Sequence, residues 1–253
     1  MRRRIYLLGS LVDKVNLKQA LEKIEEFIES KTPHHVITAN AEIIYTGREN
    51  KSLSRTLNKA DLVTADGSGV MWASKYIKDP IEERVTGIDL LNAICKQAPK
   101  KGWKLYFLGG EPGIAEKAVL KVLELEPECQ IVGYENGYFN EEETPKVIEN
   151  IQKSAPDILF VALGAPRQEF WIREHLKELN VPVCIGVGGS FDVLAGKAQR
   201  APEWMQNNSL EWLYRLYKEP WRYKRMLALP KFVLAVIGQK QKGEEDIQDE
   251  EKK

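Results

Sequence analysis

Asp66 is the residue of this sequence with the clearest chemical potential, because of what precedes and follows it. Leu62–Ala65 has the pattern of a short buried strand, and Asp66, Gly67 and Ser68 then break it before a helix-like run begins. Ligands of open α/β sheets bind beyond the carboxyl ends of the strands. Asp66 is therefore either a catalytic carboxylate at the mouth of a site or an N-cap of the following helix.

Polar or glycine-rich turns follow other predicted strands in the same way. The residues of these turns that could contact a ligand are Thr38, Asn40, Gly109, Gly110, Gln168, Gly189 and Asp192. Backbone N–H groups at such turns and at helix starts form ready sites for anions. One glycine turn is weak evidence, since any strand-to-helix turn can need glycine. Several turns at one sheet edge favour a nucleotide-like ligand.

The elements that must position these residues alternate along the chain. Strands are predicted at Ile5–Leu8, Val36–Ala39, Leu62–Ala65, Lys104–Leu108, Gln130–Val132, Ile158–Leu163 and Val183–Val187. Amphipathic helices are predicted at Leu17–Ser30, Ile88–Gln97, Ile114–Leu125, Thr144–Ser154 and Gln168–Leu179. This alternation predicts an α/β fold with a Rossmann-like, mainly parallel sheet flanked by helices.

Composition divides the chain into three segments. Residues 1–199 form the predicted core, residues 200–238 are rich in Trp, Tyr, Arg and Lys, and residues 239–253 form a mixed-charge tail that we expect to be disordered. Short aromatic and basic helices suit contact with a membrane surface, although ordinary docking of an amphipathic helix onto the core is the alternative. Lysine plus arginine equals aspartate plus glutamate at 37 each, which argues against nucleic acid as a partner.

The cysteines and the N-terminus indicate a cytoplasmic protein. The three cysteines show no CxxC spacing, and we expect buried free thiols in a reducing compartment. The apolar run at residues 5–8, after three arginines, is too short for a signal peptide, and no run approaches the roughly 20 apolar residues of a membrane span.

Several kinds of catalysis lack their usual motifs. There is no GxSxG nucleophile elbow, no GxGxxG opening the first strand-helix unit, and no Asp-x-Asp motif for a metal. His34 and His35 are adjacent, so they should point to opposite sides of a strand and make poor metal co-ligands. A metal-free scheme needs cations instead. The candidate cations, each of which could also be a solvated surface charge, are Arg84, Arg215, Arg222 and Arg225.

Six motifs together resemble the WecG/TagA/CpsF glycosyltransferase family. They are Thr38-Ala-Asn40, Ala65-Asp-Gly-Ser-Gly69, Arg84-Val-Thr-Gly87, Phe107-Leu-Gly-Gly110, Gly164-Ala-Pro-Arg-Gln-Glu169 and Gly186-Val-Gly-Gly-Ser-Phe-Asp192. They span about residues 5–200 in the family's order, and the aromatic, basic segment is similar to the TagA branch. Two departures are Arg167, where lysine is common, and Gly189-Ser190, which replaces a pair led by alanine.

The resemblance implies a reaction and a place for it. N-acetylmannosamine would pass with inversion from UDP-ManNAc to the C4 hydroxyl of GlcNAc-diphospho-undecaprenol, in synthesis of the wall teichoic acid linkage unit. The enzyme would need no metal or other cofactor and would be peripheral on the inner face of the cell membrane.

The resemblance also implies residue roles. Asp66 would be the base, and Thr38, Asn40 and Gln168 would shape the sugar pocket. Tyr138 and Asp192 would hold the nucleoside, and the C-terminal arginines would meet diphosphate at the membrane. Neutral amides and hydroxyls can grip sugar hydroxyls without repelling an anionic donor. We expect the C-terminal segment to complete the site by packing over it.

Two alternatives remain open at this point. The chain could be a sibling transferase that uses UDP-ManNAc uronic acid or UDP-glucose, or a non-catalytic nucleotide-sugar sensor or membrane scaffold. The exposed aromatic segment could also be covered by self-association, so a dimer or trimer is a further expectation.

Overall fold

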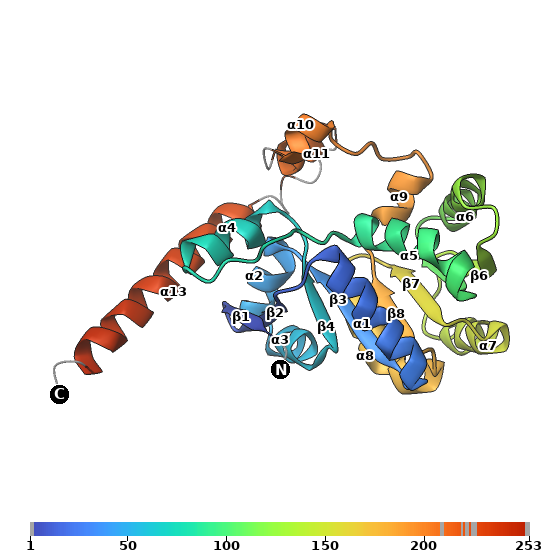
Figure 1. The fold of residues 1–253 in the computed structure, drawn as a ribbon, viewed down its shortest axis with the longest axis horizontal. Helices are drawn as coiled ribbons and strands as arrows, with labels where there is room; N and C mark the ends of the chain where they lie inside the picture. Colours follow the sequence, from blue (N-terminus) through green and yellow to red (C-terminus); the bar gives the residue numbers. More distant parts are fainter. Residues whose placement is uncertain (1–2, 208–209, 219, 221–222, 224–226, 251–253) are drawn as a thin grey trace.

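The computed structural model describes residues 3–207, 210–218, 220, 223 and 227–250. In this part of the chain the central sheet has six strands, all parallel, in the order β4-β3-β8-β7-β5-β6 (Figure 1). The bounds are β3 (His34–Ala39), β4 (Leu62–Ala65), β5 (Lys104–Gly109), β6 (Gln130–Glu135), β7 (Ile158–Ala162) and β8 (Val183–Gly186). The prediction of an α/β fold with a mainly parallel sheet is confirmed.

Helices cover both faces of the sheet because neighbouring residues of a strand point to opposite sides. On β5, for example, Phe107 packs into one core cluster and Leu108 into another. The first face is covered by α1 (Leu17–Ser30), α5 (Gly87–Lys101), α6 (Ile114–Leu125) and α9 (Ser190–Leu194). The second is covered by α2 (Ala41–Glu49), α3 (Lys51–Lys59), α4 (Ser68–Tyr76), α7 (Thr144–Ser154) and α8 (Arg167–Leu179).

The first predicted strand does not join this sheet. β1 (Arg4–Leu7) instead pairs antiparallel with β2 (Ser10–Asp13) in a separate two-stranded ribbon. Leu8 and Gly9 connect them with φ values of 49° and 91°, the backbone of a tight hairpin turn. A two-residue turn returns the chain directly, whereas a parallel neighbour needs a long crossover. The prediction was therefore right about extended backbone and wrong about its place.

The C-terminal region contains α10 (Glu203–Asn207), α11 (Glu211–Lys218) and α13 (Ala228–Glu250). Figure 1 shows α10 and α11 above the carboxyl ends of the strands, while α13 runs along α2 and α4. Phe232 and Val236 of α13 are fully buried in the core. The segment boundary expected after residue 238 thus falls inside one helix.

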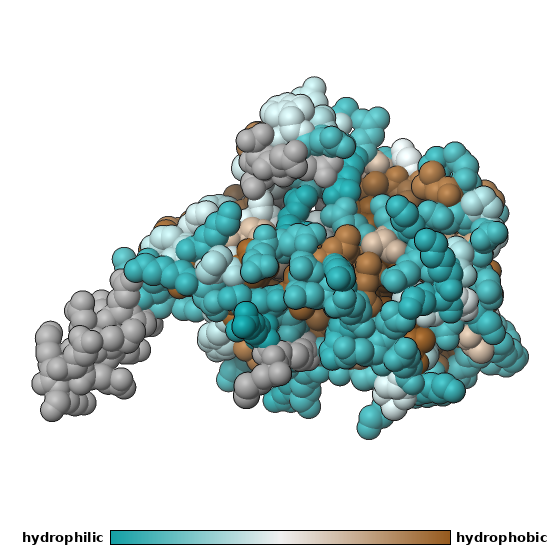
Figure 2. All heavy atoms as spheres, in the orientation of Figure 1, coloured by the Kyte–Doolittle hydropathy of each residue, from teal (hydrophilic) through white to brown (hydrophobic). Residues whose placement is uncertain are grey.

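The face of the molecule that Figure 2 shows is mostly hydrophilic. Within the described ranges, no helix combines the length and apolar character needed to cross a bilayer. Cys95, Cys129 and Cys184 are buried free thiols, as expected.

Candidate active site

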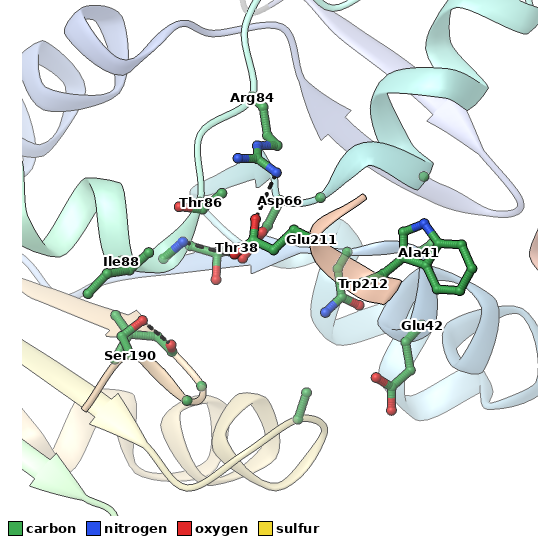
Figure 3. Close-up of a pocket in the computed structure, with 18 of the residues that line it drawn as sticks. Thr38, Ala41, Glu42, Asp66, Arg84, Thr86, Ile88, Ser190, Glu211 and Trp212 are labelled. Carbon is green, nitrogen blue, oxygen red and sulfur yellow. Dashed lines mark hydrogen bonds and ion pairs between the residues drawn. The ribbon is translucent and has the colours of Figure 1, made fainter. Parts of the chain in front are cut away.

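A cavity of about 220 Å³ opens at the carboxyl ends of four adjacent strands, β4, β3, β8 and β7 (Figure 3). Its lining includes six of the residues singled out from the sequence, namely Thr38, Asn40, Asp66, Arg84, Gln168 and Gly189. Parallel strands end at the same sheet edge, which is why turns far apart in the sequence meet here.

Asp66 is half-buried in the cavity wall, directly after β4. Its own N–H donates to the carbonyl of Ala39 over 2.8 Å, which ties the turn to the neighbouring strand. The N–H of Gly87, at the start of α5, donates to Asp66 Oδ2 over 3.3 Å. The N-cap of α4 is Gly67 rather than Asp66. The carboxylate is therefore oriented by the start of another helix while it lines the cavity.

Thr38 and Asn40 belong to the end of β3 and have structural partners as well. The buried Thr38 hydroxyl donates to the carbonyl of Gly186 over 2.9 Å, across to β8. Asn40 is the N-cap of α2, and its Oδ1 accepts from the N–H of Ile43 over 3.0 Å. Both side chains are thereby held in fixed positions at the cavity, which reduces the entropy lost when a ligand binds.

Gln168 is held from two sides at the start of α8. Its Oε1 accepts from the N–H of Gly188 over 3.1 Å, and its Nε2 donates to Glu169 Oε1 over 2.8 Å. Burial raises the pKa of the Glu169 carboxyl to about 7. A Cβ on Gly186 would lie 2.6 Å from Gln168 Nε2, so only glycine there leaves room for the amide.

The C-terminal region supplies the opposite wall of the cavity. Glu211 of α11 reaches in and pairs with Arg84 at 3.0 Å, as Figure 3 shows. Trp212 and Leu229 line the cavity beside it. Arg200 pairs with Asp89 at 2.7 Å and lies 3.9 Å from Glu211. Arg84 therefore lies at the cavity, and its charge is balanced by a carboxylate.

Four predicted binding residues do not line this cavity: Gly109, Gly110, Tyr138 and Asp192. They gather instead near the end of β5, where Gly137 N–H donates to the carbonyl of Gly110 over 2.8 Å. A Cβ on Gly109 would lie 2.5 Å from the backbone of Ala162, so strand packing already requires that glycine. β5 lies beyond β7 in the sheet, which separates this group from the turns of β3 and β4.

A lysine joins the group near β5. Lys197 lies 2.7 Å from Glu111 and 3.8 Å from Asp192, and Tyr138 is exposed. Arg215 lies on α11, whereas Arg222 and Arg225 lie outside the described residues. In the described part of the chain, no cluster of three His, Cys, Asp or Glu side chains could hold a metal ion.

The family comparison matches the sequence of this chain to a known group of proteins. The model of the glycosyl transferase WecG/TagA/CpsF family matches residues 5–246, which include the six strands of the central sheet and the residues of both cavity walls. This chain belongs to that family. The match extends through α11 and most of α13, so the C-terminal helices are part of the family's sequence pattern.

Curated relatives in this family cover most of the chain. Three are named N-acetylglucosaminyldiphosphoundecaprenol N-acetyl-beta-D-mannosaminyltransferase. The protein from Bacillus spizizenii is 37% identical over 80% of this chain and 78% of its own. That from Bacillus subtilis is 34% identical, with coverages of 88% and 86%. One from Staphylococcus aureus is 31% identical over 94% of each chain.

The sequence did not identify the acidic and apolar side chains that complete the cavity. Glu211 has no motif around it, and Leu229 looks like any apolar residue of a helix. Trp212 belongs to the segment rich in Trp, Tyr, Arg and Lys, but that composition does not place it at the cavity. Glu169 was quoted in a motif without a role, although a glutamate flanked by Gln168 and Phe170 in an amphipathic helix could have been suspected of burial.

Proposed function

We propose that this family member transfers N-acetylmannosamine from UDP-ManNAc to the C4 hydroxyl of GlcNAc-diphospho-undecaprenol, in synthesis of the wall teichoic acid linkage unit. The observation that carries the proposal is the position of Asp66 in a cavity whose other walls offer amide, hydroxyl and guanidinium groups. The names of the curated relatives supply the acceptor and the transferred sugar.

Asp66 is the general base in this scheme. The acceptor oxygen attacks the anomeric carbon of the donor sugar, the bond from that carbon to the UDP oxygen breaks, and the acceptor proton passes to the Asp66 carboxylate. Attack from the face opposite UDP inverts the configuration. The hydrogen bond from Gly87 N–H holds the carboxylate in one orientation, so less reorganisation is needed during transfer.

The remaining groups hold the substrates. Asn40 and Gln168 are neutral amides at fixed positions, suited to sugar hydroxyls beside an anionic donor. Among the described residues that line the cavity, Arg84 is the cationic one, and it would meet the diphosphate once it is released from Glu211. The Tyr138 and Asp192 group near β5 would hold the nucleoside. Arg215, Arg222 and Arg225, which the sequence suggests as further cations, would contact the phosphates from the C-terminal region.

The acceptor requires the enzyme to work at a membrane surface, because an undecaprenyl chain stays in the bilayer. Trp204 on α10 and Tyr217 on α11 are 61% and 78% exposed, and α11 also carries the cavity residues Glu211 and Trp212. Aromatic side chains favour the headgroup level of a bilayer. We propose that α10 and α11 face the inner surface of the membrane and bring the cavity to the lipid-linked sugar.

Asp66→Asn tests the central step. The assay is sugar transfer to a short-chain GlcNAc-diphospholipid, with EDTA present to test independence from metal. We expect turnover to fall by roughly 10²- to 10⁴-fold, since general base catalysis contributes that much, while UDP binding is retained. Glu42→Gln is the matched control, because it removes a different carboxylate from the same cavity. Wild-type turnover in Asp66→Asn would exclude Asp66 as the base.

The same assay separates the alternatives. Comparing transfer from UDP-ManNAc, UDP-ManNAc uronic acid and UDP-glucose identifies the donor, and preference for either of the last two would point to a sibling transferase. A sensor or scaffold would bind UDP-sugars without turnover in the wild type, and Asp66→Asn would leave its function unchanged.

A further inference from the structure

A second hollow lies away from the candidate active site, between the β1–β2 turn and helices α2 and α3. It is a groove of about 440 Å³. Its lining consists of Leu8, Gly9, Gly47, Arg48, Lys51, Ser54, Arg55, Asn58 and Lys59. The N-cap of α2, Asn40, lines the candidate site, and Arg48 lies in the last turn of α2. The two hollows are thus separated by the length of α2, about 13 Å at 1.5 Å per residue.

The groove is strongly basic. Arg48, Lys51, Arg55 and Lys59 are exposed, and the lining contains no acidic side chain among the described residues. Within the same residues, none of the four cations forms an ion pair with a carboxylate. Three of them follow one another at spacings of four along α3, where like charges repel across each turn. Among the residues that the structure describes, this part of the surface therefore carries positive charge that no carboxylate balances by an ion pair.

The β1–β2 turn, which forms the side of the groove opposite the cations, is held in place by hydrogen bonds. Asn58 of α3 accepts from the N–H of Leu11 over 2.8 Å and donates from Nδ2 to the carbonyl of Gly9 over 2.7 Å. Ser54 Oγ donates to the same carbonyl over 3.3 Å. From the other side, Gln239 of α13 accepts from the N–H of Leu8 over 2.7 Å. The groove is therefore formed before any ligand arrives, and binding does not have to order the turn.

We propose that this basic groove binds the phosphate group of an anionic ligand. Guanidinium groups bind phosphate oxygens in a bidentate manner, and ammonium groups add point charges, so Arg48 and Arg55 with Lys51 and Lys59 suit that chemistry. A phospholipid headgroup and a free phosphoester both carry such a group. The groove is separate from the candidate active site, so its occupant need not be a substrate of transfer.

The test compares a groove variant with a charge-matched control. The groove variant is Lys51→Gln with Arg55→Gln. The control is Lys117→Gln with Lys177→Gln, which removes two exposed lysines from α6 and α8, outside the groove. Pyrophosphate binding is measured by titration calorimetry. Lipid binding is measured by flotation with vesicles of phosphatidylglycerol and phosphatidylcholine, against vesicles of phosphatidylcholine alone.

We expect the wild type and the control to bind at least one anionic probe about tenfold more tightly than the groove variant, with the difference shrinking at high salt. A difference with pyrophosphate indicates a free phosphoester, and a difference with anionic vesicles alone indicates a headgroup. Contacts by the C-terminal helices are common to all three proteins and cancel. Equal binding of both probes by groove variant and control, or no binding by the wild type, would overturn the proposal.

A melting curve shows whether the groove variant is folded. Because the two substitutions remove like-charge neighbours from exposed positions, we expect a melting temperature equal to or above that of the wild type at low salt. If the groove variant melted well below the control, Lys51→Gln alone would replace it, with Lys117→Gln as its control, and the same binding comparison would decide.

Discussion

The two walls of the candidate site are built differently. The sheet wall consists of strand ends whose side chains are buried or bound to the backbone, as for Thr38 with Gly186 and Gln168 with Gly188. The helical wall from the C-terminal region reaches the cavity through Glu211, Trp212 and Leu229. Its polar contact with the sheet wall is the Arg84–Glu211 pair, whose side chains are about one-fifth exposed.

This difference indicates a division of labour. Groups on the sheet wall cannot move without disturbing the core, so they suit steps that need fixed geometry. The helical wall is joined by a partly exposed ion pair, which typically contributes less than about 1 kcal/mol. The α11 part of this wall, which carries Glu211 and Trp212, can therefore separate from the sheet wall at low cost and admit a bulky substrate. Leu229 stays in place, because α13 is anchored in the core. Substitutions in the sheet wall should therefore have large effects, and substitutions in the helical wall should have small ones.

After Asp66→Asn, the largest effect is expected from Gly186→Ala. Its Cβ would displace Gln168 Nε2, which lies 2.6 Å from that position, and a shift of about 1 Å in a positioning group can cost about 100-fold in rate. Turnover should fall by a similar factor to that in Gln168→Ala. Gly238→Ala on α13 is the control, because an added Cβ there meets nothing within 4 Å. Full activity in Gly186→Ala would show that the amide is not rigidly held.

A smaller effect is expected on stability from Glu169→Gln. Burial raises the pKa of Glu169 from 4.5 to about 7, so the folded state keeps a proton that the unfolded state releases. The free energy of unfolding should therefore fall as pH rises from about 4.5 to about 7, by at most about 3 kcal/mol. Glu169→Gln should lose this slope in urea unfolding between pH 5 and pH 8.

Glu174→Gln is the control for that measurement, because Glu174 is an exposed residue of the same helix. It should keep the wild-type pH dependence. If Glu169→Gln kept the slope as well, Glu169 would not be its source, and the sheet wall would be more hydrated than its burial indicates.

The smallest effect is expected from Glu211→Gln on the helical wall. When Glu211 is uncharged, it no longer competes with the donor diphosphate for Arg84, so the KM for the donor should fall a few-fold. The free energy of unfolding should change by less than about 1 kcal/mol. Glu203→Gln on α10, exposed and outside the cavity, is the control. A rise in KM would mean that Glu211 helps to bind the donor.

Removing the whole C-terminal region would not separate the roles of the two walls. Phe232 and Val236 of α13 are fully buried, and Gln239 hydrogen-bonds to both Leu8 and Tyr6. Truncation near residue 195 would therefore expose part of the core in addition to opening the cavity. Point variants in α11 separate the two effects.

Local patterns in the sequence were enough for the sheet and for the sheet wall of the site. Strands such as Leu62–Ala65 are short apolar runs that end in turn residues, and both signals lie within a few positions of each other. Because all six strands are parallel, each turn that follows one opens on the same edge. Asp66, Asn40 and Gln168 could be assigned to one site from that rule alone.

Only the tertiary structure revealed the helical wall, the position of the β1–β2 ribbon and the basic groove. Glu211 meets Arg84 across 127 positions, and Gln239 meets Leu8 across 231. Such contacts depend on how whole helices pack, and packing depends on shape and burial summed over many side chains. Apolar periodicity identifies which face of a helix will be buried, but it does not identify the surface that buries it.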